Sequence, residues 1–102
     1  MDKSNFQAAI EKLLNSKIVI KNYPMVEFIN IDEFHDDGML IDIVVNDEEM
    51  TADNMYDKEF DPHWLVDSYI KSALKYLGIK FKYVAFKVHT KSGKLVYHWL
   101  LD

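Results

Sequence analysis

The chain contains no cysteine, which excludes disulfide bonds, thiolate catalysis and cysteine-ligated zinc. It also contains no arginine, because all twelve basic residues are lysine. The planar guanidinium group is the commonest specific reader of base edges, so sequence-specific DNA recognition is not expected. No apolar run approaches the ~18 residues that a membrane-crossing helix needs, and the N-terminus lacks a signal-peptide pattern. We expect no membrane partner and a cytoplasmic location.

Glycine is scarce, with three residues in the whole chain. Gly38, Gly78 and Gly93 each follow a candidate turn or helix end, and none belongs to a phosphate-binding loop or a nucleophile elbow. Ser68 and Ser72 have no base at a suitable spacing. We therefore expect no catalytic residues, no cofactor and no enzymatic activity.

The sequence also lacks a metal-binding motif. None of its four histidines forms a pair at the i, i+4 spacing that places two imidazoles on one helix face. The acidic segment after residue 46 has neither the alternating acids nor the central glycine of a calcium loop. We expect no metal site.

What the chain has is a composition typical of one folded domain. It is 102 residues long, 49% hydrophobic and 28% charged, and domains cluster near ~100–150 residues. Residues 1–102 are therefore predicted to form a single domain.

Two amphipathic helices are predicted. A capping pattern at Ser4 and Gln7 precedes apolar residues at helical spacing, which predicts a helix over 4–16. Asp61 followed by Pro62 is typical of a helix start, and Gly78 of a helix end, so a second helix is expected over 61–77.

Strand-like composition and alternation predict two hairpins, over 25–45 and 81–101, and a short strand over 18–20. The predicted fold is α+β, in the order helix, hairpin, helix, hairpin, with two helices on one face of a four- or five-stranded antiparallel sheet. Its core is expected to contain Phe6, Ile10, Leu14, Ile41, Ile43, Leu65, Ile70, Leu74, Phe81, Tyr97 and Trp99.

Charge is segregated along the chain. Residues 1–30 carry four lysines against three acids, a net charge of +1, residues 31–67 carry thirteen acids against Lys58 alone, −12, and residues 68–102 carry seven lysines against Asp102 alone, +6. If the fold keeps the acidic and basic segments apart, one copy can bind the next head to tail, which builds rings or filaments. The alternative is that each segment is simply the solvated surface of its own elements.

Aromatic residues with a polar tip are common at protein interfaces. Trp64 lies at the start of the second predicted helix, where it meets solvent. The interface residues that we expect are Asp47, Glu48, Glu49, Asp53, Asp57, Trp64, Lys71, Lys80, Lys82 and Lys87.

The order of these elements resembles that of small phage neck and tail-completion proteins of the tail-terminator type. The resemblance rests on the run Met39–Val45, the helix 61–77 and the closing hairpin 81–101, and no residue motif can be transferred. It implies a virion subunit that assembles in the host cytoplasm as a homo-oligomer, including a ring, or with other virion proteins.

The sequence therefore predicts a non-enzymatic assembly subunit, placed in the neck, tail or capsid of a phage. An alternative is an acidic DNA mimic, in which the carboxylates of residues 47–59 block a host nucleic-acid-binding defence protein.

Overall fold

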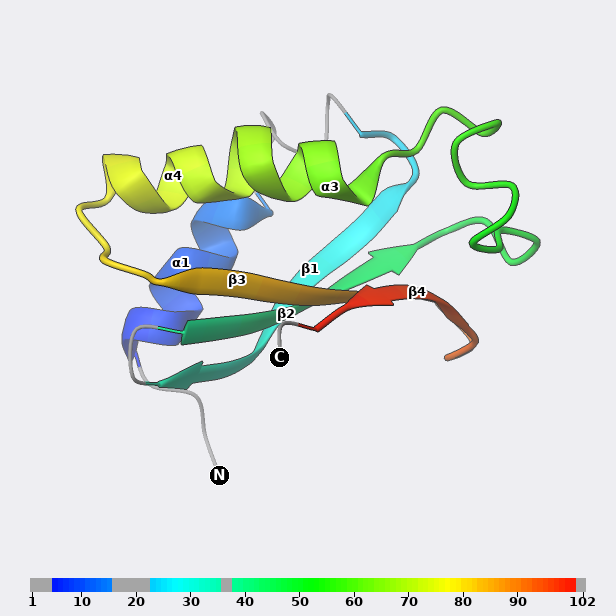
Figure 1. The fold of residues 1–102 in the computed structure, drawn as a ribbon. Helices are drawn as coiled ribbons and strands as arrows, with labels where there is room; N and C mark the ends of the chain where they lie inside the picture. The colour runs from blue at the N-terminus through cyan, green and yellow to red at the C-terminus, as the bar shows by residue number, and fades with distance from the viewer. Residues whose placement is uncertain (1–4, 16–22, 36–37, 101–102) are drawn as a thin grey trace.

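The computed structural model describes residues 5–15, 23–35 and 38–100, and shows an α+β domain (Figure 1). In chain order its elements are α1 (Asn5–Leu14), β1 (Val26–His35), β2 (Gly38–Val45), α3 (Pro62–Trp64), the π-helical segment η1 (Leu65–Ile70), α4 (Lys71–Tyr76), β3 (Tyr83–Thr90) and β4 (Leu95–Trp99). The predicted strand over 18–20 lies outside the described residues, as do Asp36, Asp37 and Leu101.

The four strands form one mixed sheet in the order β1-β2-β3-β4. The predicted hairpins are confirmed, since β1 pairs antiparallel with β2 and β3 with β4. The expectation of an all-antiparallel sheet is wrong, because β2 and β3 are parallel. The cause is the helix over 62–76, about 22 Å long at 1.5 Å per residue, which returns the chain over the sheet to the end where β2 begins (Figure 1). A parallel pair needs such a crossover connection.

The core lies between this long helix and the sheet. Leu65, Ile70 and Leu74 are 0% exposed, and Ile41 and Ile43 of β2 are equally buried. Parallel pairing sets Ile41 beside Phe86 and Ile43 beside Val88 on the covered face. Ile10 and Leu14 of α1 join the same cluster.

The long helix begins and ends as the sequence predicts. The Asp61 carboxylate accepts a hydrogen bond from the Trp64 amide at 3.2 Å, which is an N-cap. At the other end Gly78 has φ 74°, and the Ile79 amide donates to the Leu74 carbonyl at 3.0 Å. This is the Schellman arrangement, for which a residue without a Cβ is favoured.

The middle of the helix differs from the sequence pattern. In η1 the Lys71 amide donates to the Val66 carbonyl, five residues earlier, instead of the usual four. A regular α-helix predicts an apolar stripe of Leu65, Tyr69, Ile70, Ala73, Leu74 and Leu77. In the structure Val66, which is not in this stripe, is buried, and Leu77, which is, is 44% exposed.

The predicted core is confirmed for seven residues: Ile10, Leu14, Ile41, Ile43, Leu65, Ile70 and Leu74. Phe81 and Tyr97 are only partly buried, and Trp99 is 45% exposed, so its placement in the core is wrong. Trp99 is the last residue of β4, an edge strand of the sheet, so part of its ring meets solvent although it contacts His63. The side chain of Phe6 lies outside the described part of the chain.

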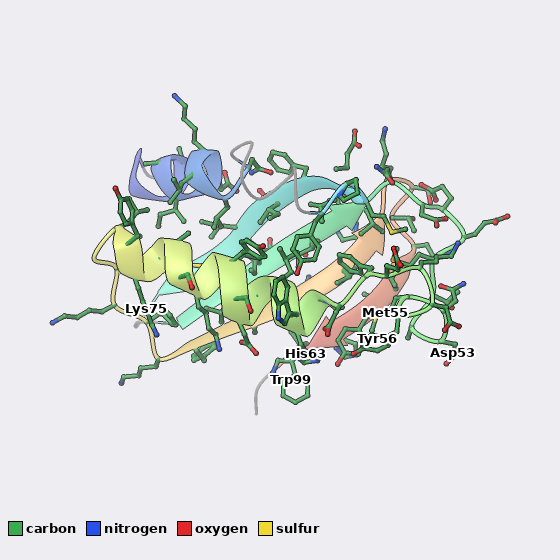
Figure 2. The ribbon with its side chains drawn as sticks, turned by 90° about the horizontal axis from the view of Figure 1, so that it is seen from above. Asp53, Met55, Tyr56, His63, Lys75 and Trp99 are labelled. Atoms are coloured by element: carbon green, nitrogen blue, oxygen red, sulfur yellow. The ribbon has the colours of Figure 1, made fainter. Side chains whose placement is uncertain are left out.

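Helix α1 runs along the outer edge of β1 rather than across the middle of the sheet (Figure 2). The Asn15 side chain donates to the Ile29 carbonyl and accepts from the Ile29 amide, both at 2.7 Å. Glu11 accepts from the Ile31 amide at 2.6 Å. Unpaired edge groups invite pairing with another chain, so these two side chains close this edge.

The buried leucine of α4 provides a test of the core. We expect Leu74→Ala to lower the free energy of unfolding by about 2–5 kcal/mol, because it removes a fully buried side chain and leaves a cavity. The matched change Leu77→Ala, at a solvent-exposed position three residues later, should cost less than about 0.5 kcal/mol. Urea titration measures both values. Equal losses of unfolding free energy for the two variants would show that Leu74 is no more buried than Leu77, and would contradict this packing of the helix.

The amide that closes the β1 edge provides a second test. Asn15→Leu keeps a similar size but removes both bonds to Ile29, and we expect a loss of about 1–3 kcal/mol from the unsatisfied backbone groups. Lys12→Leu, at an exposed position of the same helix, is the control. Aggregation during storage, followed by light scattering, should rise for the Asn15 variant alone. Equal behaviour of both variants would show that Asn15 does not protect the edge.

Candidate functional site

Residues 46–60 form an ordered acidic loop between β2 and α3. Three apolar side chains anchor it in the core: Met50, Met55 and Phe60 are at most 1% exposed. The Met55 amide donates to the Thr51 carbonyl at 3.0 Å and the Lys58 amide to the Asn54 carbonyl at 3.0 Å. The loop therefore contains the helical turn that the sequence allowed, and its acidic residues have fixed positions.

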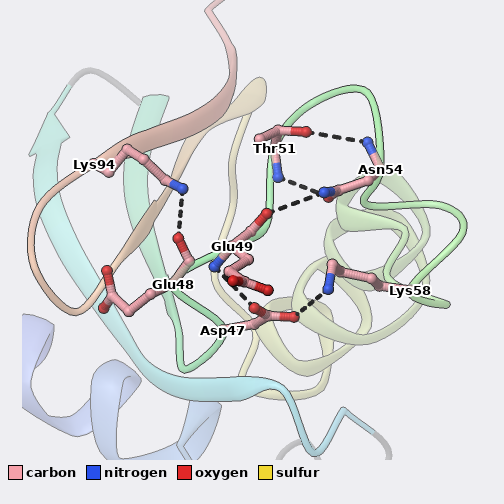
Figure 3. Close-up of polar contacts among 7 residues, drawn as sticks. All are labelled: Asp47, Glu48, Glu49, Thr51, Asn54, Lys58 and Lys94. Atoms are coloured by element: carbon pink, nitrogen blue, oxygen red, sulfur yellow. Dashed lines mark hydrogen bonds and ion pairs between the residues drawn. The ribbon is translucent and has the colours of Figure 1, made fainter.

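Side chains inside the loop stabilise its backbone (Figure 3). The Thr51 amide donates to Asn54 Oδ1 at 2.7 Å, and the Asn54 side chain donates to the Glu49 carbonyl at 3.0 Å. Local bonds of this kind are typical of Asn and Thr in turns. They hold Glu49 at the start of the turn.

The carboxylate of Asp47 has its hydrogen-bond and ion-pair partners within its own loop. Its carboxylate lies 2.8 Å from Lys58 Nζ and accepts from the Glu49 amide at 2.9 Å (Figure 3). The bond from Lys58, followed by the bond from Glu49, lowers the pKa of Asp47. Asp47 therefore stays charged and serves to shape the loop.

Glu48 ties the loop to the turn between β3 and β4. Its carboxylate accepts from the Ser92 amide at 3.1 Å and from the Ser92 hydroxyl, and its carbonyl accepts from Lys94 Nζ. The hydroxyl bond from Ser92 is the main cause that lowers the pKa of Glu48. Two of the seven C-terminal lysines, Lys91 and Lys94, thus lie at the acidic end, where Lys91 also pairs with Glu27 at 3.5 Å.

Five acids of the loop are exposed: Glu48, Glu49, Asp53, Asp57 and Glu59. Within the described residues, none of their carboxylates has an ion-pair partner within 4 Å. The loop therefore presents negative charge to solvent at one end of the molecule (Figure 1).

Lysines gather at the opposite end of the molecule. Lys71 and Lys75 lie on α4, and Lys80 and Lys82 on the link to β3. Figure 2 places Lys75 and Asp53 at opposite ends. Lys71 pairs with Asp67 at 2.9 Å, whereas Lys75, Lys80 and Lys82 are exposed. The charge segregation along the sequence is therefore only partly a segregation in space. Lys75, Lys80 and Lys82 gather at one end, whereas Lys58, Lys91 and Lys94 lie among the acids at the other.

Lys87 belongs to neither end. It lies on the uncovered face of the sheet, 3.5 Å from Asp32 and 3.8 Å from Asp42. Oδ1 of Asp42 is buried without a hydrogen bond, and His89 Nε2 lies 4.0 Å away from it. These ion pairs join neighbouring strands and occupy Lys87 within its own chain.

Trp64 lies on the outer side of the helix start, as the sequence predicts, and is 51% exposed. Its ring packs against Tyr69 at 5.1 Å and Tyr23 at 6.0 Å between centroids. One face of Trp64 therefore extends the core, and the other meets solvent.

Sequence reasoning missed a groove of about 240 Å³ between the long helix and β3. Trp99 forms one wall, and its ring lies 4.9 Å from that of His63. The Tyr97 hydroxyl is 2.6 Å from His63 Nε2, so the two side chains share a hydrogen bond, and burial raises the pKa of Tyr97. No motif marks these residues, because they meet only through the packing of the helix on β3 and β4.

No protein-family model, curated protein or solved structure matches this chain. Among the residues that the structure describes, no group of three or more metal-ligating side chains is placed to hold an ion. No helix in the described ranges is long and apolar enough to cross a bilayer. The candidate site is therefore a set of surfaces: the acidic loop, the basic end and the groove.

The contact between Glu48 and Ser92 predicts a pH dependence. A carboxyl whose folded-state pKa is lowered stabilises the fold above its unfolded-state pKa, and this is lost as pH falls through the folded-state value. Glu48→Gln should therefore lower Tm at pH 7 and leave it unchanged once the pH is below the folded-state pKa of Glu48. The control is Glu49→Gln, whose side chain makes no such bond. A Tm difference for Glu48→Gln that persists unchanged at low pH would contradict this role.

Proposed function

We propose that this domain is a non-enzymatic assembly subunit that binds further copies of itself head to tail, the acidic loop of one copy meeting the basic end of the next. The observation that carries the proposal is the position of the two charged surfaces, which lie at opposite ends of one rigid core (Figure 2). Contacts between unlike ends of a molecule close into rings or extend as filaments.

The acidic loop suits this role because it is already ordered. Its exposed carboxylates stand on a backbone fixed by Met50, Met55 and Phe60, so binding costs little conformational entropy. Charges at such a contact steer and orient the partners more than they contribute affinity. We place the assembly in a phage particle, in the neck, tail or capsid, on the order of elements alone.

The DNA-mimic alternative has less support from the geometry. It requires a continuous acidic surface facing away from lysine. Asp47 is bound to Lys58, and the backbone of Glu48 to Lys94. This leaves a smaller acidic surface interrupted by basic side chains. Capture of a nuclease or restriction subunit from host lysate, abolished by charge reversal at Glu48 and Glu49, would favour mimicry over assembly.

Two charge-reversed variants test the head-to-tail contact. Asp53→Lys with Asp57→Lys disables the acidic end, and Lys80→Glu with Lys82→Glu disables the basic end. We expect each variant alone to be monomeric, because both of its ends then carry charge of one sign. A one-to-one mixture should recover assembly, because the intact pair of ends and the reversed pair are both complementary in charge. Size-exclusion chromatography with light scattering measures the masses.

The exposed acid Glu33 of β1 supplies the control, since Glu33→Lys also reverses a charge, at one position away from the loop. It should assemble as the unaltered protein does. A mixture that stays monomeric, or variants that assemble normally on their own, would contradict a head-to-tail contact.

A further inference from the structure

The two long edges of the sheet differ in how they are closed. Asn15 and Glu11 occupy the edge of β1. At the other side, β4 pairs with β3 only from Phe86 to His89. Within the described residues, β3 over 83–85 extends beyond the end of β4 (Figure 1). The groove described above lies beside this part of β3, since Tyr83 and Val84 line it.

The groove has walls of mixed aromatic, aliphatic and polar side chains and a charged rim. Val66 of the helix, Tyr83 of β3 and Trp99 of β4 form its walls, and Asp67, Lys71 and Lys82 stand at its rim. Its volume of about 240 Å³ is below the ~300–1,000 Å³ usual for small-molecule sites. It is suited to one large side chain of a protein partner rather than to a whole ligand.

The acidic loop carries a side chain of this kind. Tyr56 is 56% exposed, although its neighbour Met55 is buried and anchors the loop. Asp53 and Asp57 flank it in the sequence. Tyrosine is among the residues that most often anchor an interface by filling a pocket on the partner.

We propose that the groove beside β3 receives Tyr56 from the acidic loop of a second copy. The inference rests on the head-to-tail assembly proposed above and identifies its contact. Asp53 and Asp57 of the incoming loop would face Lys82 at the rim, which has no ion-pair partner among the described residues, whereas Lys71 is already paired with Asp67. This attraction orients the phenol ring.

Charge selects Tyr56 over the other exposed tyrosine of comparable reach. Tyr76 is 86% exposed, but it follows Lys75 at the basic end, and the lysines at the groove rim would repel it. Charge also selects this groove over the second hollow, of about 170 Å³, beside Tyr23 and Phe60. That hollow is rimmed by Glu59 and by Lys58, which Asp47 already neutralises.

The test compares Tyr56→Ala with the matched control Tyr76→Ala. Sedimentation equilibrium should show self-association weakened at least about tenfold for Tyr56→Ala and unchanged for Tyr76→Ala. Tyr56→Phe keeps the ring and should assemble within a few-fold of the unaltered protein. Circular dichroism verifies that every variant is folded.

Trp99 reports the same contact from the side of the groove. In a Trp64→Phe background Trp99 is the only tryptophan, and its emission should shift to shorter wavelength as assembly covers it. Adding Tyr56→Ala to this background should remove the shift. Trp99→Ala should weaken association, and the loss in the double variant with Tyr56→Ala should be smaller than the two single losses combined, because both changes remove one contact.

The outcomes separate this inference from the proposal on which it rests. If charge reversal abolishes assembly while Tyr56→Ala assembles normally, head-to-tail binding stands and the groove is not its receptor. If Tyr56→Ala and Tyr76→Ala weaken assembly equally, the groove inference is also wrong. A monomeric unaltered protein at all concentrations would overturn both.

Discussion

The helix over residues 62–76 determines where every charged surface of this protein lies. The acidic loop precedes it and most of the basic end follows or overlaps its last turns, so burial of Leu65, Ile70 and Leu74 on the sheet holds the two about a helix length apart. The same crossover makes β2 and β3 parallel. A tight turn in place of this helix would bring lysines and acids together, and they would neutralise one another within one molecule.

Charge within the acidic loop has two separate uses. Asp47 and Glu48 bond to the chain itself, which fixes the loop and joins it to the turn after β3. Asp53 and Asp57 have no such bonds among the described residues and remain available to another molecule. Net charge along the sequence does not separate these groups, because the distinction depends on Ser92 and Lys94, more than forty residues away.

Local signals were sufficient for the helix ends and the hairpins. Asp61 and Gly78 act through bonds to residues within a few positions, so the sequence reveals them directly. The parallel pairing of β2 and β3 depends on the path of the whole connection, and the π segment on how the helix fits the sheet. The sequence places Trp99 in the core, but it ends the edge strand β4 and is half exposed. Lys87 of β3 pairs with Asp42 of β2 and Asp32 of β1. Strand order and side-chain partners across the sheet were not predictable from local spacing.

The central claim is that opposite ends of separate copies attract one another. Sedimentation velocity of the unaltered protein over a wide concentration range, at low salt and at ~1 M salt, tests it most directly. At low salt the Debye length of tens of ångströms leaves the ends unscreened, and at ~1 M it falls to about 3 Å. The account predicts larger species that grow with concentration at low salt and assemble more slowly at high salt. A single monomeric boundary under every condition would contradict it.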